Sequence, residues 1–215
     1  MRRGLVALVV LAAAFVAPSA ALGRAAGTDA AATSRANGAV PPARVVTLAP
    51  HLTELVYAAG AGDRIVGTVD TSDHPEAARR IPRIGDVTRL DAERLLALRP
   101  DLVLAWSDGS PAEQLALLER LGVRSLAMQQ NALADVPAAV EQLGRLFGTR
   151  HVADAEAQRL RAELAALRTR YARATPLRVF YQVWDAPLYT LGGTQVATEM
   201  LAVCGARNVF AAQRH

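Results

Sequence analysis

The sequence predicts an α/β protein with mainly parallel sheets. Short β-branched or apolar runs alternate with segments whose apolar residues recur at helical spacing, a pattern typical of parallel sheets covered by helices. A charged segment near residues 150–174 contains no glycine and predicts one long helix between two such stretches. With 215 residues, 52% of them hydrophobic, the chain is long enough for one large domain or two small lobes.

The first 23 residues predict a signal peptide. Two arginines precede an almost wholly apolar run at residues 4–17, and Pro18 and small residues follow it. The run is shorter than the roughly 20 residues of a membrane span, although an uncleaved anchor is the alternative. Cleavage is expected after Ala21 or Gly23. Residues 24–43 are small, polar and without apolar periodicity, which predicts a flexible linker.

Four strands are expected between residues 44 and 149. They are short β-branched or continuous apolar runs, which favour burial on both faces of a sheet. They cover residues 44–48, 65–69, 101–106 and 123–128. Because a helical or irregular segment separates each strand from the next, the strands are expected to be parallel.

Four helices are expected in the same segment. Gly60 ends the first, and Asp91 is expected to cap the second. Ser110 to Glu113 forms a capping box with Pro111 at the first helical position, which predicts the start of the third. The residues expected to face the core are Leu52, Leu55 and Val56, then Ala92, Leu95 and Leu96, then Leu115, Leu118 and Leu121, and finally Val136, Val140, Leu143 and Phe147.

The remaining residues predict a long helix followed by a second α/β stretch. The helix carries an apolar stripe of Leu160, Leu164, Leu167 and Tyr171 and ends before Pro176. At about 1.5 Å per residue it exceeds 30 Å, which suits a rigid spacer between lobes; an ordinary covering helix is the alternative. Strands are expected at residues 178–183 and 188–191, and a helix at residues 194–204.

The two tryptophans indicate where a ligand binds. Trp106 ends one expected strand, and Trp184 directly follows another. Ligands of open α/β sheets bind outside the carboxyl ends of the strands, where large flat side chains stack on a flat apolar ligand. The alternative is that each tryptophan covers the end of its own sheet.

Polar residues follow the first two strands. Residues 68–75 (TVDTSDHP) offer small polar groups that hydrogen-bond amides or phosphates; the alternative is a plain loop in which Asp73 caps a short helix. His51 and His74 both follow strands, which leaves a shared metal open. No metal site is expected, because none of the four histidines has metal-ligand spacing.

Several function classes are disfavoured. The sequence lacks a G-x-S-x-G elbow, a P-loop and a G-x-G-x-x-G motif, so no enzyme is expected. The formal net charge is +4, but the chain contains no lysine, and its arginines alternate with acidic residues without forming a basic block. Nucleic-acid binding is therefore not expected.

A set of short motifs runs from about residue 43 to the end of the chain. They are RVVTLAP at 44–50, TEL at 53–55, IVGT at 65–68, SDHP at 72–75, ERLLALRPDLVLAW at 93–106, LGV at 121–123, VFYQVW at 179–184, LAVCG at 201–205 and NVF at 208–210. Together they resemble the periplasmic cobalamin-binding proteins of ABC importers. ALRPDLV is shared with siderophore and haem binders, whereas SDHP and Trp106 favour cobalamin.

The resemblance implies two doubly wound α/β lobes with mainly parallel sheets, joined by one long helix. The N-terminal lobe would be residues 44–149, the connecting helix 150–175 and the C-terminal lobe 176–215. In the family the second lobe continues further, so the resemblance implies that this lobe is incomplete. Cys204, the single cysteine, matches a family cysteine that can pair with one in that further stretch.

The resemblance also implies a set of site residues. The expected ligand-binding residues are Trp106, Trp184, Thr71, Asp73 and Pro50. Thr71 occupies a contact position that can be tyrosine in the family, and Val87 replaces a family aromatic, so Trp184 is expected to compensate. Glu93 matches a glutamate that docks onto arginines of the permease; a solvated helix charge is the alternative.

The implied function is solute capture. A protein of this kind is exported to the periplasm through a cleavable signal peptide, binds cobalamin in the inter-lobe cleft and delivers it to an inner-membrane ABC importer. We expect a monomer without a cofactor, since cobalamin is the transported ligand. The alternatives are a haem or ferric-siderophore binder, with His74 and Tyr189 as candidate ligands, or a remnant that binds nothing.

Overall fold

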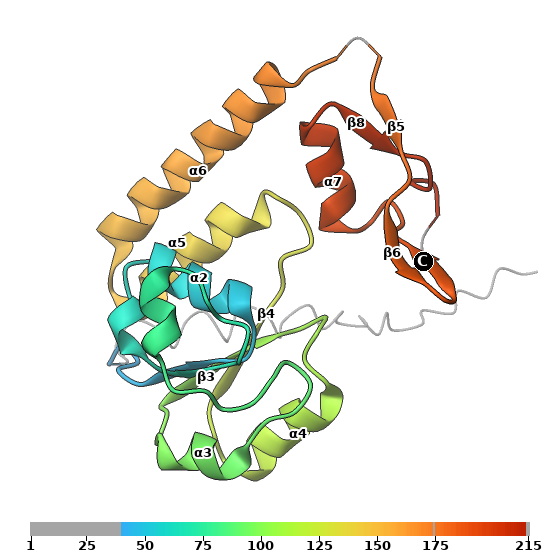
Figure 1. Ribbon diagram of the computed structural model, residues 1–215. Coiled ribbons are helices and arrows are strands. Elements are labelled where there is room, and N and C mark those ends of the chain that lie inside the picture. Colours follow the sequence, from blue (N-terminus) through green and yellow to red (C-terminus); the bar gives the residue numbers. More distant parts are fainter. Residues whose placement is uncertain (1–39, 174, 214–215) are drawn as a thin grey trace, which may run out of the picture. The chain divides into compact units, whose positions relative to one another are not determined.

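A computed structural model describes residues 40–173 and 175–213 (Figure 1). The predicted signal peptide and most of the predicted linker lie outside these residues. The elements, in chain order, are β1 (Val45–Thr47), α2 (Pro50–Ala58), β2 (Ile65–Thr68), α3 (Ala92–Ala97), β3 (Leu102–Trp106), α4 (Ala112–Arg120), β4 (Ser125–Met128), α5 (Asp135–Phe147), α6 (Arg150–Arg170), β5 (Leu177–Val179), β6 (Gln182–Asp185), β7 (Leu188–Thr190), α7 (Val196–Val203) and β8 (Ala206–Asn208), with 3₁₀ turns at Gly62–Arg64 and Glu76–Arg80.

The first four strands form one parallel sheet in the order β2-β1-β3-β4. The central pair, β1 and β3, is buried on both faces, as its continuous apolar sequence predicts. The expected parallel sheet is confirmed.

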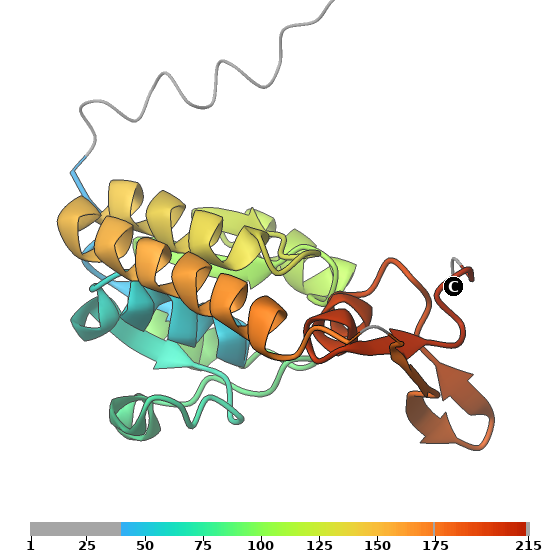
Figure 2. The same cartoon turned by 90° about the horizontal axis from the view of Figure 1, so that it is seen from above.

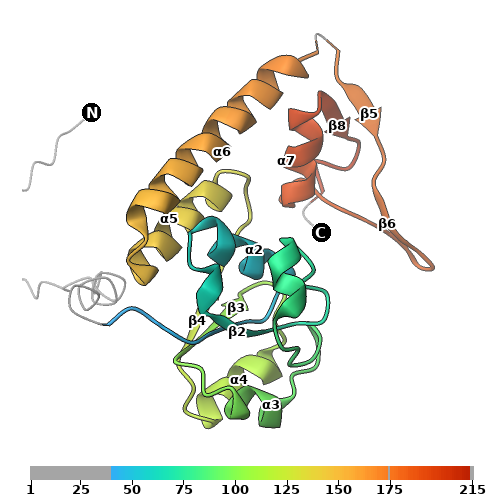
Figure 3. The same ribbon diagram turned by 60° about the vertical axis from the view of Figure 1, so that its left-hand side comes forward.

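Helices cover both faces of this sheet, α2 and α5 on one side and α3 and α4 on the other (Figure 3). Successive strand residues point to opposite faces, so Leu102 and Leu104 pack with α2 and α5, whereas Val103 and Ala105 pack toward α3 and α4. On α5, Val140, Leu143 and Phe147 are buried, which confirms the predicted apolar face of that helix.

Two local predictions on the other side of the sheet are wrong. The capping box at Ser110 does not form, because α4 begins one residue later and the Ser110 hydroxyl instead accepts a hydrogen bond from the backbone N–H of Trp106 at 3.0 Å. On α3, Asp91 caps the helix as expected, accepting from the N–H of Arg94 at 3.0 Å. Leu95 is buried, but Leu96 is 44% exposed, because this short helix turns only one leucine toward the sheet.

The long helix α6 runs beside α5 (Figure 2). Its contact face is made of small residues, since Ala153 and Ala157 are fully buried. The predicted leucine stripe further along is covered only in part, and Tyr171 is 40% exposed. Arg159 pairs with Glu156 and Glu163 within the helix, and Arg161 pairs with Glu141 of α5.

The C-terminal segment forms two small sheets. Strands β5 and β8 pair in parallel, and β6 and β7 form an antiparallel hairpin. The single strand expected at residues 178–183 is therefore two separate strands in different sheets. Cys204 ends α7 and is exposed. Within the described residues, none of the helices combines the length and the apolar character that crossing a membrane requires.

Candidate ligand-binding cavity

A cavity of about 580 Å³ lies at the carboxyl edge of the parallel sheet. Each of the four strands is followed by a lining residue: His51 after β1, His74 after β2, Trp106 at the end of β3 and Gln130 after β4. Helices α2, α5 and α6 supply most of the remaining wall, and α7 adds Val196. This size and position are those of a small-molecule or cofactor site in an open α/β sheet.

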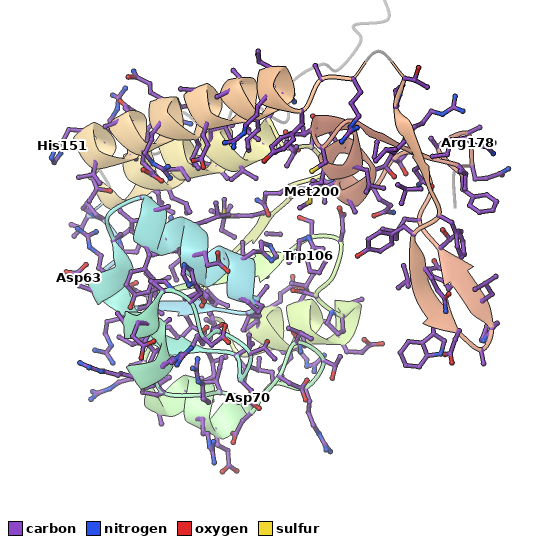
Figure 4. The ribbon with its side chains drawn as sticks, turned by 45° about the horizontal axis from the view of Figure 1, so that its top comes forward. Asp63, Asp70, Trp106, His151, Arg178 and Met200 are labelled. Carbon is purple, nitrogen blue, oxygen red and sulfur yellow. The ribbon has the colours of Figure 1, made fainter. Side chains whose placement is uncertain are left out.

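Trp106 is held in place by its neighbours, and Figure 4 marks it at the end of β3. Its ring and the His51 imidazole form a T-shaped pair, with centroids 5.1 Å apart and planes at 82°. Gly109 lies so close to the ring that a Cβ there would collide with it. About a third of the residue (36%) remains exposed, so the ring is both positioned and accessible.

The surroundings of His51 favour its uncharged imidazole. Burial lowers its pKa from the ordinary value of 6.5, because the protonated ring loses hydration; the nearby Gln130 amide opposes this only in part. At the edge of the sheet the cavity therefore offers a neutral imidazole, in which one ring nitrogen donates a hydrogen bond and the other accepts one.

Gln130 contributes a buried carboxamide. Neither its nitrogen nor its oxygen has a partner at hydrogen-bonding geometry among the described residues. The amide raises the pKa of His51 as a hydrogen-bonding neighbour, but the two side chains do not reach the distance and angles of a formed hydrogen bond.

The loop that carries His74 is anchored by a cluster of buried hydroxyl groups. Thr68 Oγ1 lies 2.9 Å from that of Thr47, 2.8 Å from that of Thr53 and 2.7 Å from Ser72 Oγ. The Thr47 and Thr53 hydroxyls are themselves 2.7 Å apart, and all four residues are fully buried. The cluster ties β1, α2 and β2 to the loop that leads to the cavity.

We predict that Thr53→Val lowers the free energy of unfolding by about 1–2 kcal/mol. The substitution keeps the shape but leaves the neighbouring hydroxyls short of a buried partner. Urea denaturation measures the change. Thr169→Val, on the exposed face of α6, is the matched control and should change stability by less than about 0.5 kcal/mol. Equal effects of the two substitutions would contradict a stabilising role for the cluster.

The arginine at the α6 wall of the cavity is neutralised by two paired glutamates. Arg159, which lines it, donates to Glu156 at 2.7 Å and to Glu163 at 2.8 Å. The glutamate bonds raise the already high pKa of this guanidinium, so it stays charged and paired. This wall is therefore a weak anion site, and a neutral ligand suits it better.

The structure brings together some of the predicted site residues. Trp106 lines the cavity, as do His51 and His74, although the described residues contain no group of three that would hold a metal. Pro50 is the first residue of α2, beside His51, and is not among the lining residues. Thr71 and Asp73 are exposed on the loop before His74 and do not line the cavity either.

Two predicted residues lie elsewhere. Trp184 is on β6, is 63% exposed and does not line the cavity. Glu93 is exposed in the first turn of α3. The ligand contacts of Trp184, Thr71, Asp73 and Pro50, and the docking role of Glu93, stay predictions.

Sequence reasoning missed the part that Gln130 plays in this cavity. Gln130 follows a predicted strand at the same edge as Trp106, so the rule that located the tryptophan applies to it as well. His51 drew attention only as a possible metal ligand.

Comparison with known proteins supports the same fold. The family described as periplasmic binding protein matches residues 45–215. A curated vitamin B12-binding protein from Vibrio vulnificus is 38% identical over 172 residues, which are 80% of this chain and 63% of the relative. The chain thus spans less than two thirds of that relative's length.

Solved structures agree. The periplasmic vitamin B12 binding protein of Vibrio cholerae superimposes with a TM-score of 0.74 at 35% identity, covering 82% of this chain and 69% of that one. A periplasmic heme binding protein from Pseudomonas aeruginosa gives a TM-score of 0.68 at 29% identity, covering 78% and 62%. With the matching family, the parallel sheet and the strand-edge cavity, the chain belongs to the periplasmic binding protein family.

Proposed function

We propose that this protein captures cobalamin in the cavity at the carboxyl edge of its parallel sheet. The observation that carries the proposal is Trp106, an accessible indole fixed at a strand end beside the neutral His51 ring, in a chain similar to vitamin B12-binding proteins. A flat face of this kind stacks on a flat, largely apolar macrocycle.

The proposed setting is the periplasm, reached through a cleavable signal peptide. There the protein would act as a monomer that passes cobalamin to an inner-membrane ABC importer. Its role is binding and delivery rather than catalysis, and cobalamin is its cargo rather than a cofactor.

Haem is the second candidate ligand. His74 lines the cavity, and an imidazole is an axial ligand for haem iron. A haem-binding structure is also similar, although at lower identity than the cobalamin-binding one. Tyr189, the other candidate iron ligand, is 58% exposed and does not line the cavity.

Calorimetric titration of the purified protein with cyanocobalamin, and separately with hemin, tests the proposal. A cooperative thermal melt of the same sample first shows that it is folded. We expect saturable one-to-one binding of cyanocobalamin and weaker binding of hemin. Preference for hemin would support the second candidate, and a folded sample that binds neither would overturn both.

Delivery is tested at Glu93. We predict that Glu93→Ala lowers cobalamin uptake several-fold in vesicles that contain the cognate importer, with cyanocobalamin affinity unchanged, because a rim charge acts mainly on association. Glu113→Ala is the matched variant, since Glu113 is exposed in the first turn of the neighbouring helix α4. Unchanged uptake in the Glu93 variant would contradict its docking role, and a loss only in the Glu113 variant would place docking on α4.

A further inference from the structure

The carboxamide of Gln130 is an unused polar group inside the cavity. Both of its polar atoms are buried, and neither has a partner among the described residues. Buried polar groups in folded proteins are almost always hydrogen-bonded, because leaving one unpaired is costly. A side chain kept in this state is therefore explained by a partner that arrives from outside the chain.

The polar neighbour of Gln130 is the His51 ring, whose pKa the amide raises, but the two side chains are not at hydrogen-bonding geometry. The cavity is also lined by Val136 and Val140 from α5 and by polar side chains, of which Glu156 and Arg159 pair with each other. The preceding residue, Gln129, behaves differently: it is exposed, and its amide donates to both carboxylate oxygens of Asp108 at 3.3 Å. Two adjacent glutamines thus have opposite environments, one paired at the surface and the other unpaired inside the cavity.

The chemistry of the group defines what it can recognise. A primary amide presents one acceptor oxygen and a donor NH₂. A complementary group therefore donates a hydrogen bond to the oxygen and accepts one from the NH₂. Another carboxamide provides both. A carboxylate provides only acceptors, so the Gln130 oxygen would remain unpaired and would face negative charge. The neighbouring His51 is neutral and adds no positive charge that would favour an anion.

We propose that Gln130 is a specificity-determining residue that pairs with a side-chain carboxamide of the ligand and discriminates against a carboxylate at the same place. This inference rests on the proposed function, because a corrinoid carries carboxamides around its rim whereas haem carries carboxylates. Gln130 thereby favours a corrinoid over haem, whereas the stacking surface of Trp106 is available to both.

The test replaces Gln130 by methionine, which is similar in length and has no amide. We expect the melting temperature to stay the same or to rise, because the substitution removes buried polar atoms that have no partner. We also expect the affinity for cyanocobalamin to fall by about 10-fold or more, because the ligand amide then loses its partner on binding. Gln129→Met is the matched control and should leave the affinity unchanged.

A second probe isolates recognition of the amide. The wild-type protein should bind at least one side-chain monocarboxylic acid of cyanocobalamin about 10-fold more weakly than cyanocobalamin itself. Gln130→Met should remove that difference, whereas Gln129→Met should keep it.

The inference alone is overturned if the wild type binds cyanocobalamin and Gln130→Met retains both affinity and discrimination. It is likewise overturned if Gln130→Met lowers the melting temperature by several degrees, since the amide is then a structural partner. Failure of the wild type to bind cyanocobalamin overturns the proposed function and this inference together.

Discussion

Replacing Trp106 by alanine is expected to lower the affinity for cyanocobalamin by about 30-fold or more, a loss of about 2 kcal/mol. The indole stands at the carboxyl end of β3, where Gly109 and His51 fix its orientation. Because the ring is already ordered in the free protein, binding costs little conformational entropy, and the exposed part of the ring is available to the ligand. Calorimetric titration measures the change.

Trp184→Ala is the control for this experiment. Trp184 is the only other tryptophan of the chain and lies on the β6–β7 hairpin, away from the lining residues of the cavity. If the strand-edge cavity holds the ligand by itself, Trp184→Ala changes the affinity little. A larger loss for Trp184→Ala than for Trp106→Ala would move the main stacking contact to the hairpin. The Trp184→Ala melt should remain close to that of the wild type, since Trp184 is 63% exposed, whereas Trp106→Ala should melt at a lower temperature because most of that residue is buried.

The sequence was sufficient to predict the main sheet and its edge. Strands such as 101–106 are continuous apolar runs because both faces of the sheet are covered, and that pattern is visible without knowledge of the partners. The place of Trp106 follows from the same reasoning, because the carboxyl ends of parallel strands meet at one edge.

Features that depend on non-local competition were not predictable. The sequence around Ser110 matches a helix cap, but the Ser110 hydroxyl instead accepts a hydrogen bond from the backbone N–H of Trp106. Gln130 is one of two adjacent glutamines, and nothing local distinguishes the buried unpaired amide from the exposed paired one. The division of residues 178–183 between two sheets likewise depends on β8, whose residues pair with β5 residues 29 positions earlier in the chain.

The close packing of α5 and α6 leads to a second large effect, at Gly144. A Cβ on this residue would collide with the Cβ of Ala153, which is fully buried where the two helices meet. In an exposed helix, Gly→Ala stabilises by about 1 kcal/mol. Here we expect Gly144→Ala to destabilise by about 2–3 kcal/mol, because the added methyl forces apart two packed backbones. Urea denaturation measures the sign as well as the size of the change.

Exchanging the two side chains separates this packing effect from other costs. Ala153→Gly alone should destabilise by about 1–2 kcal/mol through lost burial and lower helix propensity. In the double variant Gly144→Ala/Ala153→Gly, one methyl again occupies the contact, so the total loss should fall short of the sum of the single losses by at least about 1 kcal/mol. Strict additivity would show that the two residues do not share one packing site.

Because α6 supplies Glu156, Arg159 and Leu160 to the cavity wall, Gly144→Ala should also weaken cyanocobalamin binding, and the double variant should recover part of the lost affinity. The glycine inside α5 thus sets how closely α6, which carries part of the cavity wall, approaches α5.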